Sequence, residues 1–422
     1  MASPKDHLGG REPDPRGATE PSMVRRRWRQ ARRIMHDEGI TSLGARALGP
    51  LALRVTEKNA TLGVRAADVL AADMAAPRAA APAGGRGDGP YTVNWVTTPS
   101  TGGSGGHTTM FRIIEHLVAN GHRCRIYLYD IGGGHASGHE AAMRRSYPAQ
   151  GCEILDALDG MADADVVFAT AWSTAYVAFN DPCAGKRFYF VQDFEPSFYP
   201  WGAEATLAEN TYRMGFHAVT AGRWLADKLT REYAMPADHF DFGCDIARYE
   251  VLPDVRRNGI AFYARRDAAR RAYDLGVLAF QIFAAARPDI EIHFYGERVG
   301  RLPFPFVDHG LVSVGELNTI YNRCYAGLSL SMTNVSLVPY EMLAAGCVPV
   351  VNDAEHNRVV LDNPYVEYAA PTPHALARAL IDIVDRPDFE SGVPAMVGSV
   401  ASASWADAGA KVEAVLRREL SG

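Results

Sequence analysis

Residues 91–130 read YTVNWVTTPSTGGSGGHTTMFRIIEHLVANGHRCRIYLYD, and this segment gives the clearest indication of the fold. Its apolar start, 91–96, predicts a strand, and a glycine-rich loop follows. Apolar residues then recur at 3.6-residue spacing, which is typical of a helix; Asn120 and Gly121 end it before a second apolar strand. A strand, loop, helix and strand in this order predict a parallel sheet.

The same alternation continues along the chain in two series of similar size. The first series goes on through DADVVFATAW (163–172), KRFYFVQDFEP (186–196) and AVTAGRWLADKL (218–229). The second begins near residue 258 with NGIAFYAR (258–265), AYDLGVLAFQIFAAA (272–286), EIHFYGE (291–297), YAGLSLSM (325–332), PYEMLAAG (339–346) and CVPVVND (347–353). The sequence therefore predicts an α/β chain of two Rossmann-like domains with an interdomain cleft.

Composition narrows the classes of function. The 422 residues are 47% hydrophobic and 22% charged, and the net charge of −6 disfavours non-specific nucleic-acid binding. Six scattered cysteines form no CxxC pair, which predicts buried thiols in a reducing compartment and no zinc site. Neither a membrane-length apolar run nor an apolar signal core is present, so we expect a cytoplasmic protein.

The first 90 residues differ from the rest. Residues 1–22 have the composition of a disordered segment, residues 23–75 that of a helical extension, and 75–90 that of an Ala/Pro/Gly linker. Between 24 and 54 there are eight arginines and only two acidic residues. Arg25–Arg33 is a candidate for peripheral contact with the anionic inner face of the cell membrane; a helical extension packed on the catalytic domains is the alternative.

Three loops are candidates for ligand binding. The first is the glycine loop, where glycines let backbone N–H groups approach a ligand and the following helix N-terminus favours an anion. A tight turn without ligand explains these glycines equally well. The residues of the glycine loop are Gly102, Gly103, Ser104, Gly105, Gly106 and His107.

The second candidate is the arginine loop, residues 264–272. Arg265 follows the first strand of the second series, and Arg270 lies five residues further on, near a helix start. Two guanidiniums in this place are able to clamp a diphosphate, whereas an exposed basic helix face is the alternative.

The third candidate is the polar loop, residues 329–337, which precedes a helix carrying Glu341. Loop amides and the helix dipole favour phosphates, and a carboxylate accepts hydrogen bonds from both hydroxyls of a ribose. A glutamate favoured there only by the helix dipole is the alternative. Asp193 and Glu195 follow the C-terminal end of another strand, where side chains of parallel sheets form sites.

These loops resemble those of a known family. Glu341 with AAGCVPVV (344–351) is similar to the E-A-M-A-x-G-x-P-V-V stretch of retaining GT-B glycosyltransferases of family 4. GCDIARYE (243–250) resembles their G-V-D-x-x-x-F segment, Arg265 matches their G-R arginine and Arg270 takes the place of their lysine. Within that group, FYFVQDFEPSFYPWG (188–202) and PYEMLAAG most resemble bacterial rhamnosyltransferases of the S-layer glycan and rhamnan type.

The resemblance implies an acceptor-binding domain over 91–250, a nucleotide-sugar-binding domain over 251–402, and a helix over 403–422 that crosses back to the first domain. It implies a donor, dTDP-L-rhamnose, a glycan or lipid-linked glycan acceptor, and a retaining reaction that needs neither cofactor nor metal. Asp193, Glu195, Arg265 and Arg270 are then the expected catalytic residues. The expected donor-binding residues are Arg265, Arg270, Tyr295, Gly296, Thr333, Asn334, Val335, Ser336, Leu337 and Glu341.

One departure from the family bears on the donor. The family carries two glutamates eight residues apart, and the position eight residues before Glu341 is Thr333. A donor with an altered or 6-deoxy sugar fits this change. The residues also leave open another NDP-hexose donor and a non-catalytic glycan-binding or scaffold protein. A sugar-nucleotide epimerase or NAD(P)-dependent enzyme is disfavoured, because the acid–base and nicotinamide motifs that it needs are missing.

Overall fold

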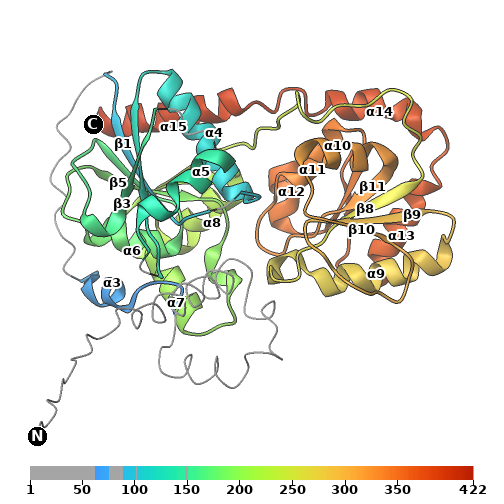
Figure 1. The fold of residues 1–422 in the computed structure, drawn as a ribbon, viewed down its shortest axis with the longest axis horizontal. Helices are drawn as coiled ribbons and strands as arrows, with labels where there is room; N and C mark the ends of the chain where they lie inside the picture. The colour runs from blue at the N-terminus through green and yellow to red at the C-terminus, as the bar shows by residue number, and fades with distance from the viewer. Residues whose placement is uncertain (1–61, 76–88, 101, 133, 148–150, 422) are drawn as a thin grey trace, which may run out of the picture. The chain divides into compact units, whose positions relative to one another are not determined.

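The structure, a computed structural model, describes residues 62–75, 89–100, 102–132, 134–147 and 151–421. The predictions for residues 1–22, for Arg25–Arg33 and for most of the linker lie outside these residues. The described elements form two parallel sheets with helices on their faces, as Figure 1 shows. The α/β prediction is confirmed.

The first sheet has seven parallel strands in the order β3-β2-β1-β4-β5-β6-β7. The strands are β1 (Thr92–Thr97), β2 (Arg123–Leu128), β3 (Glu153–Asp156), β4 (Val166–Ala169), β5 (Lys186–Val191), β6 (His217–Ala221) and β7 (Ala237–Phe240). Side chains alternate between two cores: Trp95 packs with Phe168 on one face, and Val96 packs with the core that contains Tyr189 on the other. Burial of both faces explains why these strands read as nearly continuous apolar runs.

Helices connect the strands of the first sheet. They are α4 (Gly105–Ala119), α5 (Glu140–Ser146), α6 (Trp172–Asn180), α7 (Ala203–Asn210) and α8 (Arg223–Tyr233), with short 3₁₀ turns η2 (Ala136–Gly138), η3 (Ala157–Asp159), η4 (Glu195–Phe198) and η5 (Thr211–Arg213). Ser104 caps α4 by accepting a hydrogen bond from the His107 amide. The glycine loop therefore leads from β1 into the first turn of α4.

The second sheet has six parallel strands in the order β10-β9-β8-β11-β12-β13. They are β8 (Gly259–Tyr263), β9 (Glu291–Tyr295), β10 (Val307–Gly310), β11 (Cys324–Leu328), β12 (Val348–Asn352) and β13 (Glu367–Ala369). The helices are η6 (Ala269–Arg271), α9 (Tyr273–Ala286), α10 (Val314–Arg323), α11 (Val338–Ala344), α12 (Glu355–Leu361), α13 (Pro373–Val384) and α14 (Phe389–Gly398). Its strand order reverses between β8 and β11, which are neighbours, and this is where open parallel sheets bind ligands.

The last helix, α15 (Trp405–Leu420), packs against α4 and β7 of the first domain. Gly409 lies against the His116 ring, where a Cβ would be only 2.2 Å away. Glu413 contacts the rings of both His116 (3.1 Å) and His122 (3.3 Å).

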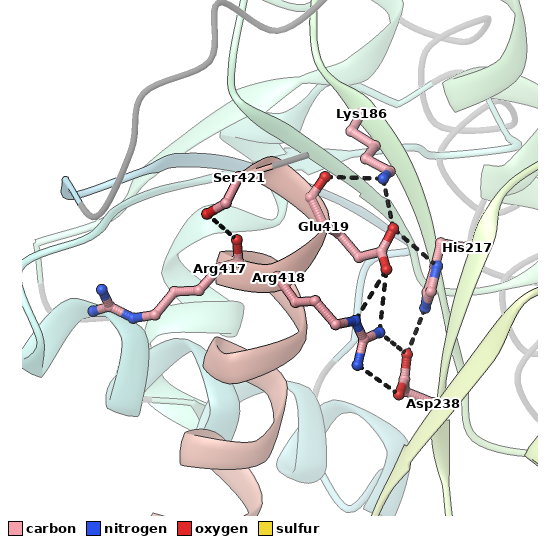
Figure 2. Close-up of polar contacts among 7 residues, drawn as sticks. All are labelled: Lys186, His217, Asp238, Arg417, Arg418, Glu419 and Ser421. Carbon is pink, nitrogen blue, oxygen red and sulfur yellow. Dashed lines mark hydrogen bonds and ion pairs between the residues drawn. The ribbon is translucent and has the colours of Figure 1, made fainter.

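An ionic cluster fastens the end of α15 to the ends of three strands (Figure 2). Glu419 accepts from Lys186 of β5 (2.6 Å) and lies 3.5 Å from the His217 ring of β6. Asp238 of β7 pairs with both His217 (2.7 Å) and Arg418 (2.5 Å). The C-terminal helix thus returns to the first domain.

A short described part of the N-terminal extension also packs on the first domain. It contains α3 (Ala66–Ala71), and the buried Val64 precedes this helix. The Asp68 carboxylate accepts from the Tyr129 hydroxyl (2.5 Å), and the Gly63 amide donates to Glu204 (3.0 Å). Residues 62–75 therefore pack with the first domain.

Candidate active site

Two loops meet at the switch point of the second sheet because β8 and β11 are adjacent. The arginine loop follows β8, and the polar loop follows β11. The Met332 amide donates to the Arg270 carbonyl (2.9 Å), and Arg271 Nη1 donates to Ser331 Oγ (3.0 Å). The two segments predicted separately from sequence are thus bonded to each other.

Of the four arginines in the arginine loop, Arg265, Arg270 and Arg271 form a cluster, and the sequence predicted the first two. Arg266 pairs instead with Glu297. Arg271, the third member of the cluster, is bonded into the polar loop. Burial lowers the pKa of Arg271, and the charges of Arg270 and Arg265 lower it further. Mutual repulsion among partly desolvated cations marks a place that favours an anion. The sequence signal for this third cation is the second arginine of the Ala269-Arg270-Arg271 turn.

Most of the polar loop is buried, although Met332 is 37% exposed. Thr333 and Asn334 are 4% and 0% exposed, Val335 is buried and Leu337 packs against the core. Within the described parts of the chain, three buried polar atoms of this loop have no hydrogen-bond partner: Thr333 Oγ1, Asn334 Oδ1 and Ser336 Oγ. Buried polar atoms normally have partners, so these atoms are suited to a polar ligand.

Asp193 and Glu195, which come just after β5, have different environments. Asp193 Oδ2 lies 3.3 Å from Arg270 Nε, and the Arg270 guanidinium stacks 4.4 Å from the centre of the Phe198 ring. The structure therefore brings one predicted carboxylate of the first domain to a predicted arginine of the second.

Glu195 is buried and already has partners. Its carboxylate accepts from the Trp172 amide at the start of α6 and from the Tyr189 hydroxyl (3.2 Å). Burial raises the pKa of Glu195 to about 8, while the bond from the Trp172 amide opposes the rise. Its neighbours in the structure hold α6 and η4 together, so Glu195 is bonded away from the arginines.

The glycine loop approaches the same strand end. Gly102 and Gly103 have φ values of +102° and +73°, which favour glycine, and Gly106 accepts at its carbonyl from Gln192 Nε2 (3.0 Å). His107 is held within the loop, because its ring bonds to Ser104 Oγ (2.9 Å) and the Thr98 carbonyl (2.9 Å). The His107 side chain thus supports the loop, and Gly102, Gly103 and Gly105 are exposed.

The remaining donor-site candidates lie around the polar loop at different depths. Glu341 is in α11, and burial raises its pKa to about 7. The charge of Asp245 also raises this pKa, whereas the hydrogen bond with Tyr249 lowers it. Tyr295 is 2% exposed and its hydroxyl bonds to Tyr321 (2.7 Å), so its side chain is part of the core. Gly296 has a φ of +109°, and a Cβ there would be 2.8 Å from the Ala264 carbonyl.

Two properties of the described residues bear on metal and membrane binding. No three His, Cys, Asp or Glu side chains of that part of the chain gather in a group able to hold a metal ion. Of its helices, none combines the length and the apolar character required to cross a bilayer.

Comparison with protein families gives two matches. Residues 258–381 match the model of the WsaF C-terminal domain, and residues 155–221 match the model of the WsaF N-terminal domain. The first region runs from β8 into α13, and the second runs from the end of β3 through β6.

Among curated proteins, the chain is similar to the O-antigen biosynthesis protein RfbC of Myxococcus xanthus. The two are 32% identical over 231 residues, which is 52% of this chain and 18% of RfbC. The chain therefore corresponds to less than a fifth of that relative's length.

Solved structures share the fold at low sequence identity. Anabaena Alr3699/HepE, solved in complex with UDP-glucose, superposes with a TM-score of 0.59 at 12% identity over 78% of this chain and 99% of that one. A variant of S. aureus TarM, solved with Fondaparinux, alpha-GlcNAc-glycerol and UDP, gives a TM-score of 0.62 at 7% identity over 77% and 99%. With its two parallel sheets and flanking helices, the chain has the GT-B fold, as predicted.

Proposed function

We propose that this chain is a glycosyltransferase that moves a sugar from a nucleoside-diphosphate donor onto a growing cell-surface glycan. The observation that carries the proposal is the cluster of Arg265, Arg270 and Arg271 bonded to the polar loop at the switch point of the second sheet. The WsaF domain matches and the likeness to an O-antigen biosynthesis protein support the glycan class of acceptor.

In this proposal the arginine loop binds the donor diphosphate. Guanidiniums form charge-assisted and often bidentate bonds to phosphate, and they stabilise the charge that develops on the leaving group. Three such groups supply enough positive potential for a metal-independent reaction. Glu341 accepts hydrogen bonds from the ribose, and the unpartnered Thr333 and Ser336 hydroxyls bind the sugar.

The chemical step we propose keeps the configuration of the transferred sugar. The bond between the anomeric carbon and the diphosphate oxygen breaks, and the acceptor oxygen attacks from the same face. The departing phosphate oxygen takes the acceptor proton. In this proposal Asp193 orients Arg270 and the acceptor, and its pairing with Arg270 supports the first of these roles.

We further propose that the donor is dTDP-L-rhamnose. Thr333, Asn334 and Ser336 offer neutral groups and no carboxylate, which suits a 6-deoxy sugar with fewer hydroxyls to bind. An unpaired buried carboxylate in the same place would cost about 1–3 kcal/mol or more.

A competition assay tests both levels of the proposal. The purified protein is offered dTDP-rhamnose, UDP-glucose, UDP-galactose and GDP-mannose together, and sugar transfer and donor hydrolysis are followed by mass spectrometry. We expect dTDP-rhamnose to be consumed first. Preference for one of the other three would overturn the donor assignment alone, whereas no turnover of any donor would contradict the glycosyltransferase assignment.

A further inference from the structure

The Asn334 side chain joins the polar loop of the second domain to two strand ends of the first. Its Nδ2 donates to the Gln192 carbonyl just after β5 (2.9 Å) and to the Ala221 carbonyl at the end of β6 (3.1 Å). Asn334 is fully buried. One carboxamide thus uses both of its N–H donors on the first domain.

Nothing in its own domain binds this side chain among the described residues. The backbone carbonyl of Asn334 accepts from Ser331 Oγ, which fixes the main chain, but both bonds of the carboxamide cross to the first sheet. Asn334 Oδ1 has no partner in that part of the chain. A role confined to stiffening the polar loop does not account for these bonds.

The strand end that Asn334 holds is also the one that carries the predicted chemistry. Gln192 donates from Nε2 to the Gly106 carbonyl of the glycine loop (3.0 Å), and the next residue, Asp193, pairs with Arg270. Gly222, just after β6, packs closely against Val360 of α12, since a Cβ on Gly222 would be 2.8 Å from the Val360 side chain. Asn334 therefore bonds the polar loop directly to the strand end that contacts the glycine loop and Arg270.

We propose that Asn334 is a positioning residue that holds the ends of β5 and β6 against the polar loop, and so sets Asp193 and the glycine loop relative to the arginines. This inference rests on the proposed function, because it assigns Asn334 a part in transfer. Physically, only a group with two donors fits two carbonyl oxygens; a carboxylate of the same shape would repel both.

The test compares Asn334→Asp and Asn334→Ala with Asn322→Asp. Asn322 is the matched control, because it is equally buried and also donates to two carbonyls, those of Glu250 (2.9 Å) and Asn318 (2.9 Å), away from the polar loop. We expect both Asn334 variants to lower kcat for sugar transfer at least tenfold while the calorimetric Kd for dTDP changes less than threefold. Asn322→Asp should lower Tm and leave both kcat and the Kd for dTDP near their wild-type values.

A distance measurement makes the inference independent of activity. Spin labels on Arg231→Cys in α8 and Leu278→Cys in α9 report the separation of the two domains, and the six native thiols are buried. We expect a broader distance distribution in Asn334→Ala than in wild type, and broader still without dTDP. An unchanged distribution together with unchanged kcat would overturn the inference, as would an equal loss of dTDP affinity and kcat. A wild-type protein inactive on every donor would instead count against the proposed function.

Discussion

Burial and one or two close partners determine the pKa and the role of individual side chains in this protein. Glu195 and Glu341 are both carboxyl groups near the predicted site, and burial raises the pKa of each. Glu195 is occupied by the Trp172 amide and the Tyr189 hydroxyl, whereas Glu341 has the Tyr249 hydroxyl as its hydrogen-bond partner. Because of these partners, we interpret Glu195 as a structural carboxyl group and Glu341 as a candidate ligand-binding group.

At this scale we predict that Glu341→Gln weakens dTDP binding about tenfold at pH 8, because one charge-assisted acceptor for the ribose is lost. Since burial raises the pKa of Glu341 to about 7, wild-type affinity should increase between pH 6 and pH 8 as the group ionises. Calorimetry with free dTDP measures both effects. Tyr249→Phe is the control for the hydrogen bond to Glu341, and an unchanged affinity in Glu341→Gln would leave this residue a purely structural role.

Among the secondary-structure elements, α15 is held to the first sheet by charges that lie far apart in sequence. Glu419 and Asp238 both contact His217, and Arg418 pairs with Asp238 (Figure 2). Glu413 lies between two histidines. The family resemblance implies a helix over 403–422 that crosses back to the first domain, but nothing local in the sequence identifies the residues that it contacts. The packing of α15 on α4 determines which charged residues meet. Gly409 allows this packing because a Cβ there would be too close to the His116 ring.

We predict that Glu419→Gln lowers the free energy of unfolding by about 0.5–1 kcal/mol, because its partners are partly exposed and screened. The loss should shrink as salt is raised from low to high concentration. Urea denaturation at two salt concentrations measures it. Glu232→Gln, which breaks an exposed pair with Lys228 in α8, is the control. A loss that does not depend on salt would argue for packing in place of the ionic contact.

A pair of histidines on β9 and β10 is expected to make the stability of the protein depend on pH. His293 is buried with its Nδ1 3.1 Å from His309 Nε2, and burial lowers the pKa of His293 to about 4, with His309 adding to the shift. Glu291 raises this pKa and Arg323 lowers it. Because the folded pKa lies below the unfolded value of about 6.5, the stabilisation is complete above pH 6.5 and is lost as the pH falls toward 4.

The expected size of that loss is on the order of 3 kcal/mol between pH 7 and pH 4. The His293→Gln variant should have a flatter stability curve over this range, because its side chain does not take up a proton. Urea unfolding at pH 7, 5.5 and 4 gives the comparison. Parallel curves for the variant and the wild type would contradict the assignment.

Across the whole molecule, much of the architecture was predictable, because parallel strands buried on both faces and helices with 3.6-residue spacing leave strong local patterns. The positions of the glycine, arginine and polar loops followed from where those strands end. Contacts between distant segments were not predictable: Arg271 bonding to Ser331, Asn334 reaching β5 and β6, and the Tyr295 side chain lying in the core depend on three-dimensional packing.

The proposed sugar transfer depends most on the arginine loop, which is proposed to bind the donor diphosphate. The most direct test is kcat/KM for transfer from dTDP-rhamnose in Arg265→Ala, Arg270→Ala and the control Arg266→Ala, whose exposed side chain pairs with Glu297 outside the cluster. We expect each of the first two to lose about a hundredfold, ~3 kcal/mol of transition-state stabilisation, with little change in Tm, and the control to stay near wild type. Wild-type turnover in Arg265→Ala and Arg270→Ala would contradict the claim.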